Sequence, residues 1–394
     1  MQKRRRLAQR HKNPVRKVNE LLGESMNLAS WRDSATWVES YGHTAVLAAG
    51  GGLIGLSFGF LAQRSRFCLR AAVIEFWHRR FGDKLSVWLL AFSSAVIGVQ
   101  LMALMGWLDT GNARQMSARG SISGALIGGL LFGVGMVMTR GCASRLLVLS
   151  ANGNLRALLS GLIFAVTAQA TLAGGLSPLR SAISSWWTVE GGAQRDVLAL
   201  LGVGHGAGLV MGGVWLAAAL YFALRSPQRT VWMWLGGIGT GLMVAAAWGF
   251  SQWVAAGSFD PVQIQGLTFS GPSAEWLMRV MQWPAPAIGF DFGLMPGVFL
   301  GSLIGALIGK DWKLEGFSDG YSMRRYIGGA VLMGFGSMLA GGCAVGAGVT
   351  GGAIFALTAW LSLAAMWVGA GLADRWLDGG PEVSRRTATG LKQP

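Results

Sequence analysis

The chain of 394 residues is 52% hydrophobic and 13% charged, with 61 glycines, 18 tryptophans and a formal net charge of +15. Average soluble domains carry about a quarter charged residues, so this composition excludes most soluble classes and is typical of an integral membrane protein. A positive charge favours nucleic acid as a partner only when it forms a basic patch on a soluble domain. No such domain is visible, and nucleic acid is not expected as a partner.

The N-terminus is a strongly basic arm, with eight basic residues and no acidic residue in the first 17 positions. The first long apolar stretch begins near Thr44, too late for the hydrophobic region of a cleaved signal peptide, so we expect the N-terminus to be retained. We assign residues 1–43 to this arm. Its segment 18–43 is either an interfacial helix or loosely ordered, and anionic lipid on the cytoplasmic face is its expected contact.

Long apolar stretches fill the rest of the chain. A transmembrane helix needs about 20 mainly apolar residues, and such stretches lie approximately at 44–62, 85–107, 121–139, 155–176, 206–224, 231–250, 289–309, 326–342 and 352–373. The sequence therefore predicts an all-α polytopic membrane protein with about nine transmembrane helices. We divide it into a first transmembrane half at 44–225, a second half at 226–376 and a cytoplasmic tail at 377–394.

The distribution of basic residues predicts the orientation. Positive-inside counting places the loop 310–325 and the tail in the cytoplasm, and the stretch 251–289 outside. The rule contradicts itself near the N-terminus, because both the basic arm and the segment 64–84, with six basic residues, favour the cytoplasm with one span between them. A re-entrant half-helix at 63–81 removes the conflict, since broken backbone is tolerated where it lines a protein cavity. Residues 272–283 have the same character.

An internal repeat locates the candidate site. Residues 133–143 align with 334–344 at an offset of 201, and five of the eleven positions are identical. In each copy a glycine-rich helix ends at Gly-Cys-Ala, which makes Gly141 and Gly342 part of the predicted site. Duplicated halves that meet at interrupted helices are the sequence sign of a transporter's binding site.

All three cysteines fall at helix ends or breaks: Cys142 and Cys343 in the repeat, and Cys68 in the first re-entrant candidate. A membrane cysteine is often only a small packing residue, but this placement favours a function. An odd number of scattered cysteines argues against a disulfide framework. The helix 236–253, which is the expected relative of the one before Cys68, ends without a thiol, so the counterpart of Cys68 is left open.

Arginines lie within four residues of two of the cysteines: Arg64, Arg66, Arg140 and Arg145. Arginine is a good planar partner for a tetrahedral oxyanion, and ionisable residues at membrane depth default to function. The alternative is that they anchor helix ends at the cytoplasmic boundary. We weigh the two readings equally for Arg64 and Arg145, and favour function for Arg66 and Arg140.

Other polar residues carry weaker signals. Asp291 follows the external stretch and is expected to cap the next helix. Asn154 is expected to stabilise the turn after Cys142, and His205 is expected to be a packed polar residue.

No Cys/His spacing resembles a zinc site, no phosphate-binding loop is present, and no pair of nucleophile and base is visible. We therefore expect no metal, no cofactor and no enzymatic activity. The Gly-x3-Gly spacings, such as Gly124/Gly128 and Gly301/Gly305, are explained by close helix packing.

Four segments resemble the YeeE/YedE sulfur-transport membrane family: 64–68, 140–159, 289–307 and 333–351. The resemblance runs from about residue 50 to residue 374. It implies an inner-membrane permease for thiosulfate or a related small sulfur compound, with nine crossing helices, additional non-crossing helices and two pseudo-symmetric halves that form an hourglass. It also implies that Cys68, Cys142 and Cys343 mark the pathway. The basic arm and the segment 177–205 are not hallmarks of the family.

The chemistry of these residues suits such a substrate. Thiosulfate is a tetrahedral dianion with a soft terminal sulfur, so a neutral thiol can donate a weak S–H bond to it while arginines and helix N-termini bind the charge. We interpret the three cysteines as handing the anion inward, from Cys343 to Cys142 to Cys68, without covalent change.

Two other interpretations stay open. The cysteines could relay sulfane sulfur as persulfides, in a membrane sulfurtransferase-like protein that delivers it to a small soluble sulfur-carrier protein on the cytoplasmic side. The chain could also be a non-transporting membrane subunit whose cysteines are packing residues. Sulfite, sulfide and a selenium analogue stay open as substrates, as do channel-like and ion-coupled transport.

Overall fold

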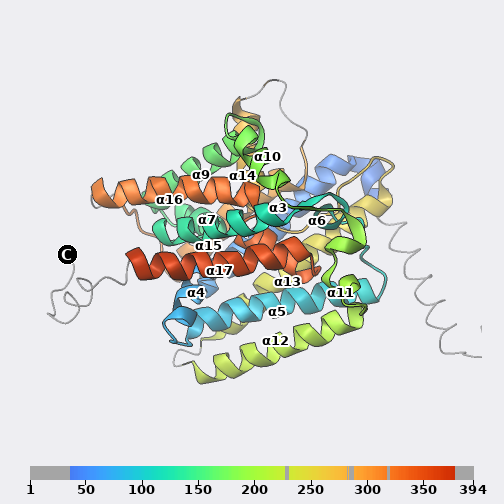
Figure 1. Ribbon diagram of the computed structural model, residues 1–394, viewed down its shortest axis with the longest axis horizontal. Coiled ribbons are helices and arrows are strands. Elements are labelled where there is room, and N and C mark those ends of the chain that lie inside the picture. The colour runs from blue at the N-terminus through green and yellow to red at the C-terminus, as the bar shows by residue number, and fades with distance from the viewer. Residues whose placement is uncertain (1–35, 227–229, 282, 284–287, 317–319, 378–394) are drawn as a thin grey trace, which may run out of the picture.

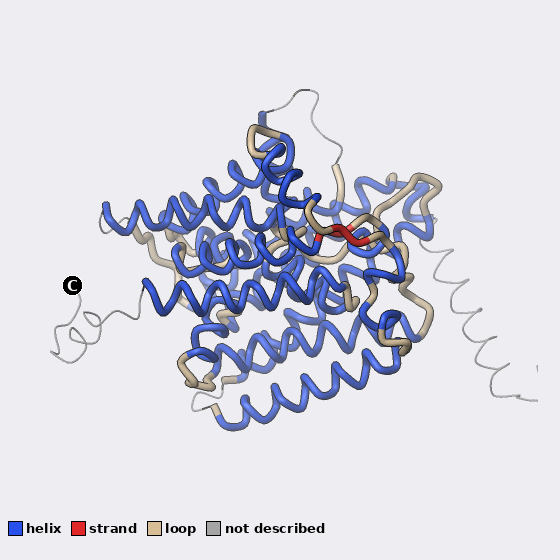
Figure 2. The backbone as a smooth tube through the Cα atoms, viewed as in Figure 1, coloured by secondary structure: helices blue, strands red, loops and turns tan. Residues whose placement is uncertain are grey.

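The computed structural model describes residues 36–226, 230–281, 283, 288–316 and 320–377. Within these residues, nine helical stretches are long and apolar enough to cross a membrane, and they lie side by side in one bundle (Figure 1). The only strands in this part of the chain are the two-residue β1 (Gly120–Ser121) and β2 (Thr188–Val189), which form one short ladder (Figure 2). The all-α polytopic prediction is confirmed. The predictions for residues 1–35 and 378–394 lie outside the described residues.

The nine stretches are formed by α3 (His43–Ser65) with α4 (Leu69–Trp77), α5 (Asp83–Leu104), α7 (Ile122–Met138) with α8 (Ala143–Ala151), α9 (Leu155–Ala173), α12 (His205–Arg225), α13 (Val231–Gly257), α15 (Phe290–Gly309), α16 (Gly320–Leu339) with the π-helix η2 (Ala344–Gly351), and α17 (Leu357–Leu377). Shorter elements connect them: α6 (Arg114–Ser117), α10 (Ser177–Ser185), the 3-10 turn η1 (Gly192–Arg195), α11 (Val197–Leu200) and α14 (Ser270–Met281). The first segment predicted to be re-entrant contains the short helix α4, and the second overlaps α14, which begins two residues earlier.

The helix packing repeats itself. Helix α3 packs along α15 and α5 along α13, while α7 packs along α17 and α16 along α9. We match α3, α5, α7 and α9, in that order, with α13, α15, α16 and α17. The α3–α15 pair then corresponds to the α13–α5 pair, and the α7–α17 pair to the α16–α9 pair. The packing is therefore pseudo-symmetric, as expected for two related halves. Helix α12 packs on α5 and has no counterpart in this scheme. The division of the chain at residue 226 stays a prediction.

The two halves run in opposite directions. On α3, Gly50 faces Phe250 of α13, while Ser65 at the other end of α3 faces Gly236 of α13, so these matched helices are antiparallel. Five stretches, from that of α3 to that of α12, cross before α13. Because this number is odd, α13 crosses in the direction opposite to α3. This is the inverted-repeat arrangement of many secondary transporters.

Glycine allows the matched helices to touch through their backbones. Between α3 and α15, a Cβ atom added to any of six glycines would lie within 2.6 Å of a carbonyl oxygen on the facing helix: Gly51, Gly55, Gly59, Gly293, Gly297 and Gly301. Helices α7 and α16 approach equally closely at Gly128 and Gly336. In lipid there is no hydrophobic driving force between helices, so their association depends on the close van der Waals packing that small residues allow. The packing role predicted for the Gly-x3-Gly spacings is confirmed.

We predict that Gly293→Ala destabilises the bundle, because its Cβ would lie 1.8 Å from the backbone oxygen of Ala48. Overpacking of this kind costs about 1–3 kcal/mol, so the apparent melting temperature in detergent should fall by several degrees. The matched control is Gly161→Ala on α9, where an added Cβ meets nothing within 4 Å. Equal melting temperatures for the two variants would contradict the role given to the α3–α15 contact.

Candidate functional site

Each of the three cysteines begins a short helix at a chain break. Cys68 is the N-cap of α4, Cys142 of α8 and Cys343 of η2, and all three have extended backbone. Each thiol is buried and free, with at most 8% of the residue exposed. The amino end of a helix carries a partial positive charge from its unpaired N–H groups. Every thiol therefore lies where an anion would also be favoured.

The three breaks share one backbone plan. Two residues before each cysteine lies a residue with left-handed backbone: Arg66 (φ 55°), Arg140 (φ 57°) and Gly341 (φ 79°). A left-handed residue is a common way to end a helix. The side chain of Arg66 is 63% exposed and lies 3.9 Å from Asp311, and Arg140 is exposed. Both arginines thus end helices through their backbone, and a contact of their side chains with an anion stays a prediction.

Arg64 is held by neighbouring helices. Its guanidinium carbon lies 4.6 Å from the ring centroid of Trp232 on α13. The guanidinium also packs against Gly309 of α15, where an added Cβ would collide with it. A cation over an aromatic ring is stabilised electrostatically. The structure thus gives Arg64 a packing partner, and its predicted role in anion binding stays a prediction.

Cys68 and Cys142 come together although 74 positions separate them in the sequence. Their side chains interact directly with each other, and the Cys142 Sγ lies 3.4 Å from the Ser144 Oγ. Arg145 is a charged neighbour of both thiols, and its Nη1 donates to the Gln63 Oε1 at 3.3 Å. We call these five residues the inner cluster. It combines S–H and O–H donors with one guanidinium, a set that can hold an anion with soft and hard acceptor atoms.

Reading the sequence did not find the whole inner cluster. Arg145 was singled out only through its distance along the chain from Cys142. Gln63 and Ser144 are buried polar residues within membrane-spanning segments. Both lie just outside the spans predicted from the sequence, so only their closeness to Arg64 and Cys142 along the chain could have indicated them.

Cys343 lies apart from this pair, at the start of η2. Its Sγ accepts a hydrogen bond from the Gly346 backbone N–H at 3.5 Å. The Gly346 carbonyl accepts a bond of 2.9 Å from the Gln115 side chain, and Thr268 packs so closely that a Cβ on Gly346 would lie 2.4 Å from its hydroxyl oxygen. Helix η2 contacts α8. The helix that begins at Cys343 therefore touches the helix that begins at Cys142.

The two repeated glycines differ in how tightly they are enclosed. A Cβ on Gly342 would lie 2.7 Å from the backbone nitrogen of Ala347, whereas a Cβ on Gly141 would meet the Leu146 side chain at an ordinary 3.5 Å. Glycine is therefore sterically required in the second copy of the repeat and replaceable in the first.

The second half holds an aromatic residue where the first holds Cys68. Helices α4 and α14 begin at Leu69 and Ser270, which reproduces the repeat offset of 201 and pairs Cys68 with Phe269. Phe269 is fully buried, and its ring centroid lies 5.3 Å from that of Phe58. The counterpart of Cys68, left open by the sequence, lies beyond the end of helix 236–253, because α13 continues to residue 257 and the matching break comes later.

Two cavities lie beside the chain break that precedes Cys343. One of about 200 Å³ is lined by Gly341 and Gly342, with Arg114 and Gln115. A second, of about 550 Å³, shares Arg114, Gln115 and Gly341 with it and is otherwise rich in arginine and serine side chains. The two cavities therefore adjoin. They give an anion a basic, hydroxyl-rich approach to the break at Cys343.

Arg195 is the buried cation of the larger cavity. It is 7% exposed, and it donates to the Ala118 carbonyl at 2.6 Å and to the Thr358 hydroxyl at 2.7 Å. Burial lowers the pKa of this guanidinium from its ordinary value. That ordinary value is far above neutral pH, so the group adds positive charge to the wall. Arg195 lies in the segment 177–205, which is not a hallmark of the family that the motifs resemble.

The weaker polar signals had mixed outcomes. Asn154 caps α9 with its side chain, and the His205 Nδ1 lies 3.0 Å from the Gln100 Oε1, so both predictions are confirmed. The capping prediction for Asp291 is wrong. The N-cap of α15 is Gly289 without any side-chain capping bond, and Asp291 instead faces a cavity. In the described part of the chain, no group of three or more His, Cys, Asp or Glu residues is placed to hold a metal ion.

Inverted repeats with broken helices, whose breaks carry buried polar groups, define the class of membrane transport proteins. A family model described as sulphur transport matches residues 64–372, and the chain belongs to this family. The resemblance seen in the motifs is confirmed.

Two relatives carry the same printed name, thiosulfate transporter TsuA. The chain is 26% identical over 359 residues to the Escherichia coli (strain K12) protein, which covers 86% of this chain and 97% of the relative. It is also 26% identical over 329 residues to the Spirochaeta thermophila protein, which covers 79% of this chain and 93% of the relative.

We predict that mild oxidation of the purified protein links Cys68 to Cys142 and leaves Cys343 free, because only the first two thiols touch. Peptide mass spectrometry with and without reduction measures this. Cys343→Ala should give the same cross-link, and Cys68→Ala should give none. A cross-link that involves Cys343 would show that the arrangement of the three thiols is different.

Proposed function

We propose that the chain is an inner-membrane permease for the uptake of thiosulfate or a closely related small sulfur anion. The observation that carries this proposal is the set of three buried thiols, each at the amino end of a short helix inside an interrupted membrane-spanning stretch. Membership of the sulphur transport family and the names of two relatives that cover most of the chain support the choice of substrate.

The proposed route begins at the adjoining cavities and passes Gly341 to Cys343. From there the contact between η2 and α8 leads to Cys142 and Cys68. Each thiol donates a weak S–H bond to the soft sulfur of the anion. This contact requires a neutral thiol, because a thiolate would repel the anion. Weak contacts in series let the anion leave as easily as it binds. No covalent step is needed, so we propose that the protein is not an enzyme.

Arg145 supplies the charge at the inner cluster in this proposal, since it neighbours both thiols. Arg66, near Asp311, and Arg140 lie just before the two cysteines and would meet the anion as it leaves. Arg64 would contribute at longer range from its place on Trp232. Gly141 and Gly342 shape the bends that expose the thiols.

We propose that the C-terminus is cytoplasmic. The basic residues of the 310–325 loop support this. His78 and Asp374, 2.6 Å apart, place the end of α17 beside the end of α4. With the nine crossings found in the described residues, the start of α3 is then outside. The cytoplasmic placement predicted for the basic arm does not follow from this arrangement, and residues 1–35 lie outside the described part of the chain.

Cys142→Ala and Cys343→Ala should each reduce uptake of radiolabelled thiosulfate into proteoliposomes at least about tenfold, a loss of about 1.4 kcal/mol of transition-state stabilisation. Ser93→Ala is the matched control, because Ser93 is a small, fully buried polar residue of α5 outside the proposed route. Wild-type uptake by both cysteine variants would show that the cysteines are packing residues outside the route, whereas absence of uptake by the wild type itself would favour the non-transporting subunit. Competition by sulfite and sulfide in the same assay measures the selectivity.

The sulfurtransferase-like alternative is not favoured, since both relatives are named transporters. The two readings differ in covalent chemistry. We expect intact-mass spectrometry after exposure to thiosulfate to show no persulfide, which would add about 32 Da to a cysteine. A stable adduct on Cys68 would instead support a sulfur relay, and with it a soluble sulfur-carrier partner.

A further inference from the structure

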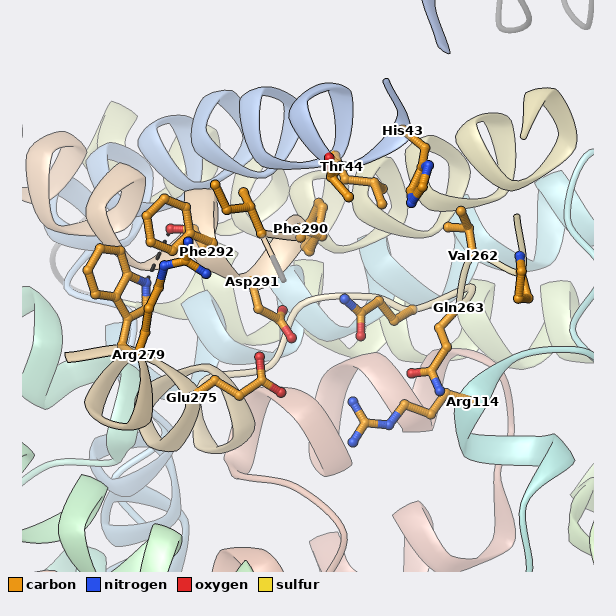
Figure 3. Close-up of a pocket in the computed structure, with 16 residues that line it drawn as sticks. His43, Thr44, Arg114, Val262, Gln263, Glu275, Arg279, Phe290, Asp291 and Phe292 are labelled. Carbon is orange, nitrogen blue, oxygen red and sulfur yellow. Dashed lines mark hydrogen bonds between the residues drawn. The ribbon is translucent and has the colours of Figure 1, made fainter. Parts of the chain in front are cut away.

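A buried carboxylate at the outer end of α15 has no part in the route described above. Asp291, the second residue of the helix, is 7% exposed. Its Oδ1 atom has no hydrogen-bond partner among the described residues. The side chain lines a cavity of about 300 Å³ and points into it (Figure 3). An unpaired polar atom at this depth is costly, and ionisable residues in membrane helices are functional by default.

A second carboxylate faces the first. Glu275 of α14 directs its carboxylate toward that of Asp291 (Figure 3), and the two charges influence each other. Arg114 of α6 points toward the pair from across the cavity (Figure 3). The Gln265 side chain also interacts with Asp291. No ion pair within 4.0 Å joins Arg114 to either carboxylate. Burial and a facing negative charge both disfavour the ionised form of a carboxylate, so Asp291 is suited to hold a proton.

The other charged groups around the cavity are engaged elsewhere. His43 of α3 lies 3.2 Å from Asp260, which is exposed. The Arg279 guanidinium lies 4.6 Å from the Phe292 ring centroid. The groups left to respond to a proton at Asp291 are therefore Glu275 and Arg114.

The carboxylate pair adjoins the proposed route. Arg114, Gln265 and Glu275 line the 300 Å³ cavity and also the 200 Å³ cavity that reaches Gly342. A dianion that waits beside Cys343 therefore meets the electrostatic field of the pair. When both carboxylates are ionised they repel the dianion and compete with it for Arg114. When a proton is bound, this repulsion falls and Arg114 is left to the anion.

We propose that Asp291 and Glu275 form a proton-binding site whose protonated state admits the anion to the cavity beside Cys343. This inference rests on the proposed permease function. It makes transport sensitive to pH through the protein itself, without any proton gradient. The sign follows from the chemistry: proton binding increases as the pH falls, so exchange of the anion should be faster at lower pH.

The test is equilibrium exchange of labelled thiosulfate in proteoliposomes with the same pH on both sides. For the wild type we expect the exchange rate to fall at least about threefold between about pH 5 and about pH 8, a range above the ordinary carboxyl pKa. Asp291→Asn mimics the protonated acid and should give fast exchange with a flat pH profile. Glu275→Gln, at an exposed position, should weaken the pH dependence in the same direction. Glu190→Gln removes an exposed carboxylate that pairs with Arg119 and should keep the wild-type profile.

Several outcomes would overturn the inference. A flat wild-type profile would do so, as would a wild-type profile in both Asp291→Asn and Glu275→Gln. Exchange that requires sodium in the wild type and loses that requirement in Asp291→Asn would assign the site to a metal cation instead. Absence of wild-type exchange at every pH would refute the permease function itself, a different result from loss of its pH dependence. Gel filtration of each variant confirms that it is folded.

Discussion

A helix broken inside a membrane leaves backbone N–H and C=O groups without partners, and lipid offers none. The structure depends on meeting this constraint at the breaks that carry the three cysteines. Around the breaks, long helices approach until their backbones touch, with glycines on α3, α7, α15 and α16 providing the room. Protein groups thereby enclose the interrupted segments, as where Thr350 of η2 donates to the Leu267 carbonyl at 2.6 Å. The high glycine content therefore allows the close helix packing that keeps the thiols buried.

The two halves use one backbone plan for different chemistry. The first half supplies two thiols that touch, together with Arg145. The second half supplies Cys343, and it places Phe269 where a fourth thiol would complete the symmetry. The polar groups near Cys343 are neutral side chains such as Gln115 and Thr268, and the arginines stand further out along the cavities. The proposed route is thus symmetric in its scaffold and directional in its contacts.

Reading the sequence recovered what is encoded locally. Apolar runs of sufficient length indicated the spans, and the two copies of the Gly-Cys-Ala motif indicated two of the breaks, because each run and each copy is a short continuous segment. The contact of Cys68 with Cys142 and the bond between Gln63 and Arg145 depend on how α3 meets α8, which no periodic pattern records. The error at Asp291 has the same origin: an acid at the start of a helix resembles a cap until the neighbouring α14 is in place. The correspondence of Cys68 with Phe269 could be recognised only from where α4 and α14 begin, because a thiol and an aromatic ring share no chemistry.

Helix α12 is the least integrated part of the bundle, with Gly208, Gly212, Ala219 and Ala223 as its buried residues and α5 as its main neighbour. Its importance is that it makes the number of membrane crossings before α13 odd. Without it, four crossings, α3 included, would precede α13, and the second half would enter the membrane in the same direction as the first. The antiparallel contact of α3 with α13 would then be lost, and with it the meeting of the broken helices. A lipid-facing helix outside the proposed route therefore decides whether a duplicated half can close on its partner.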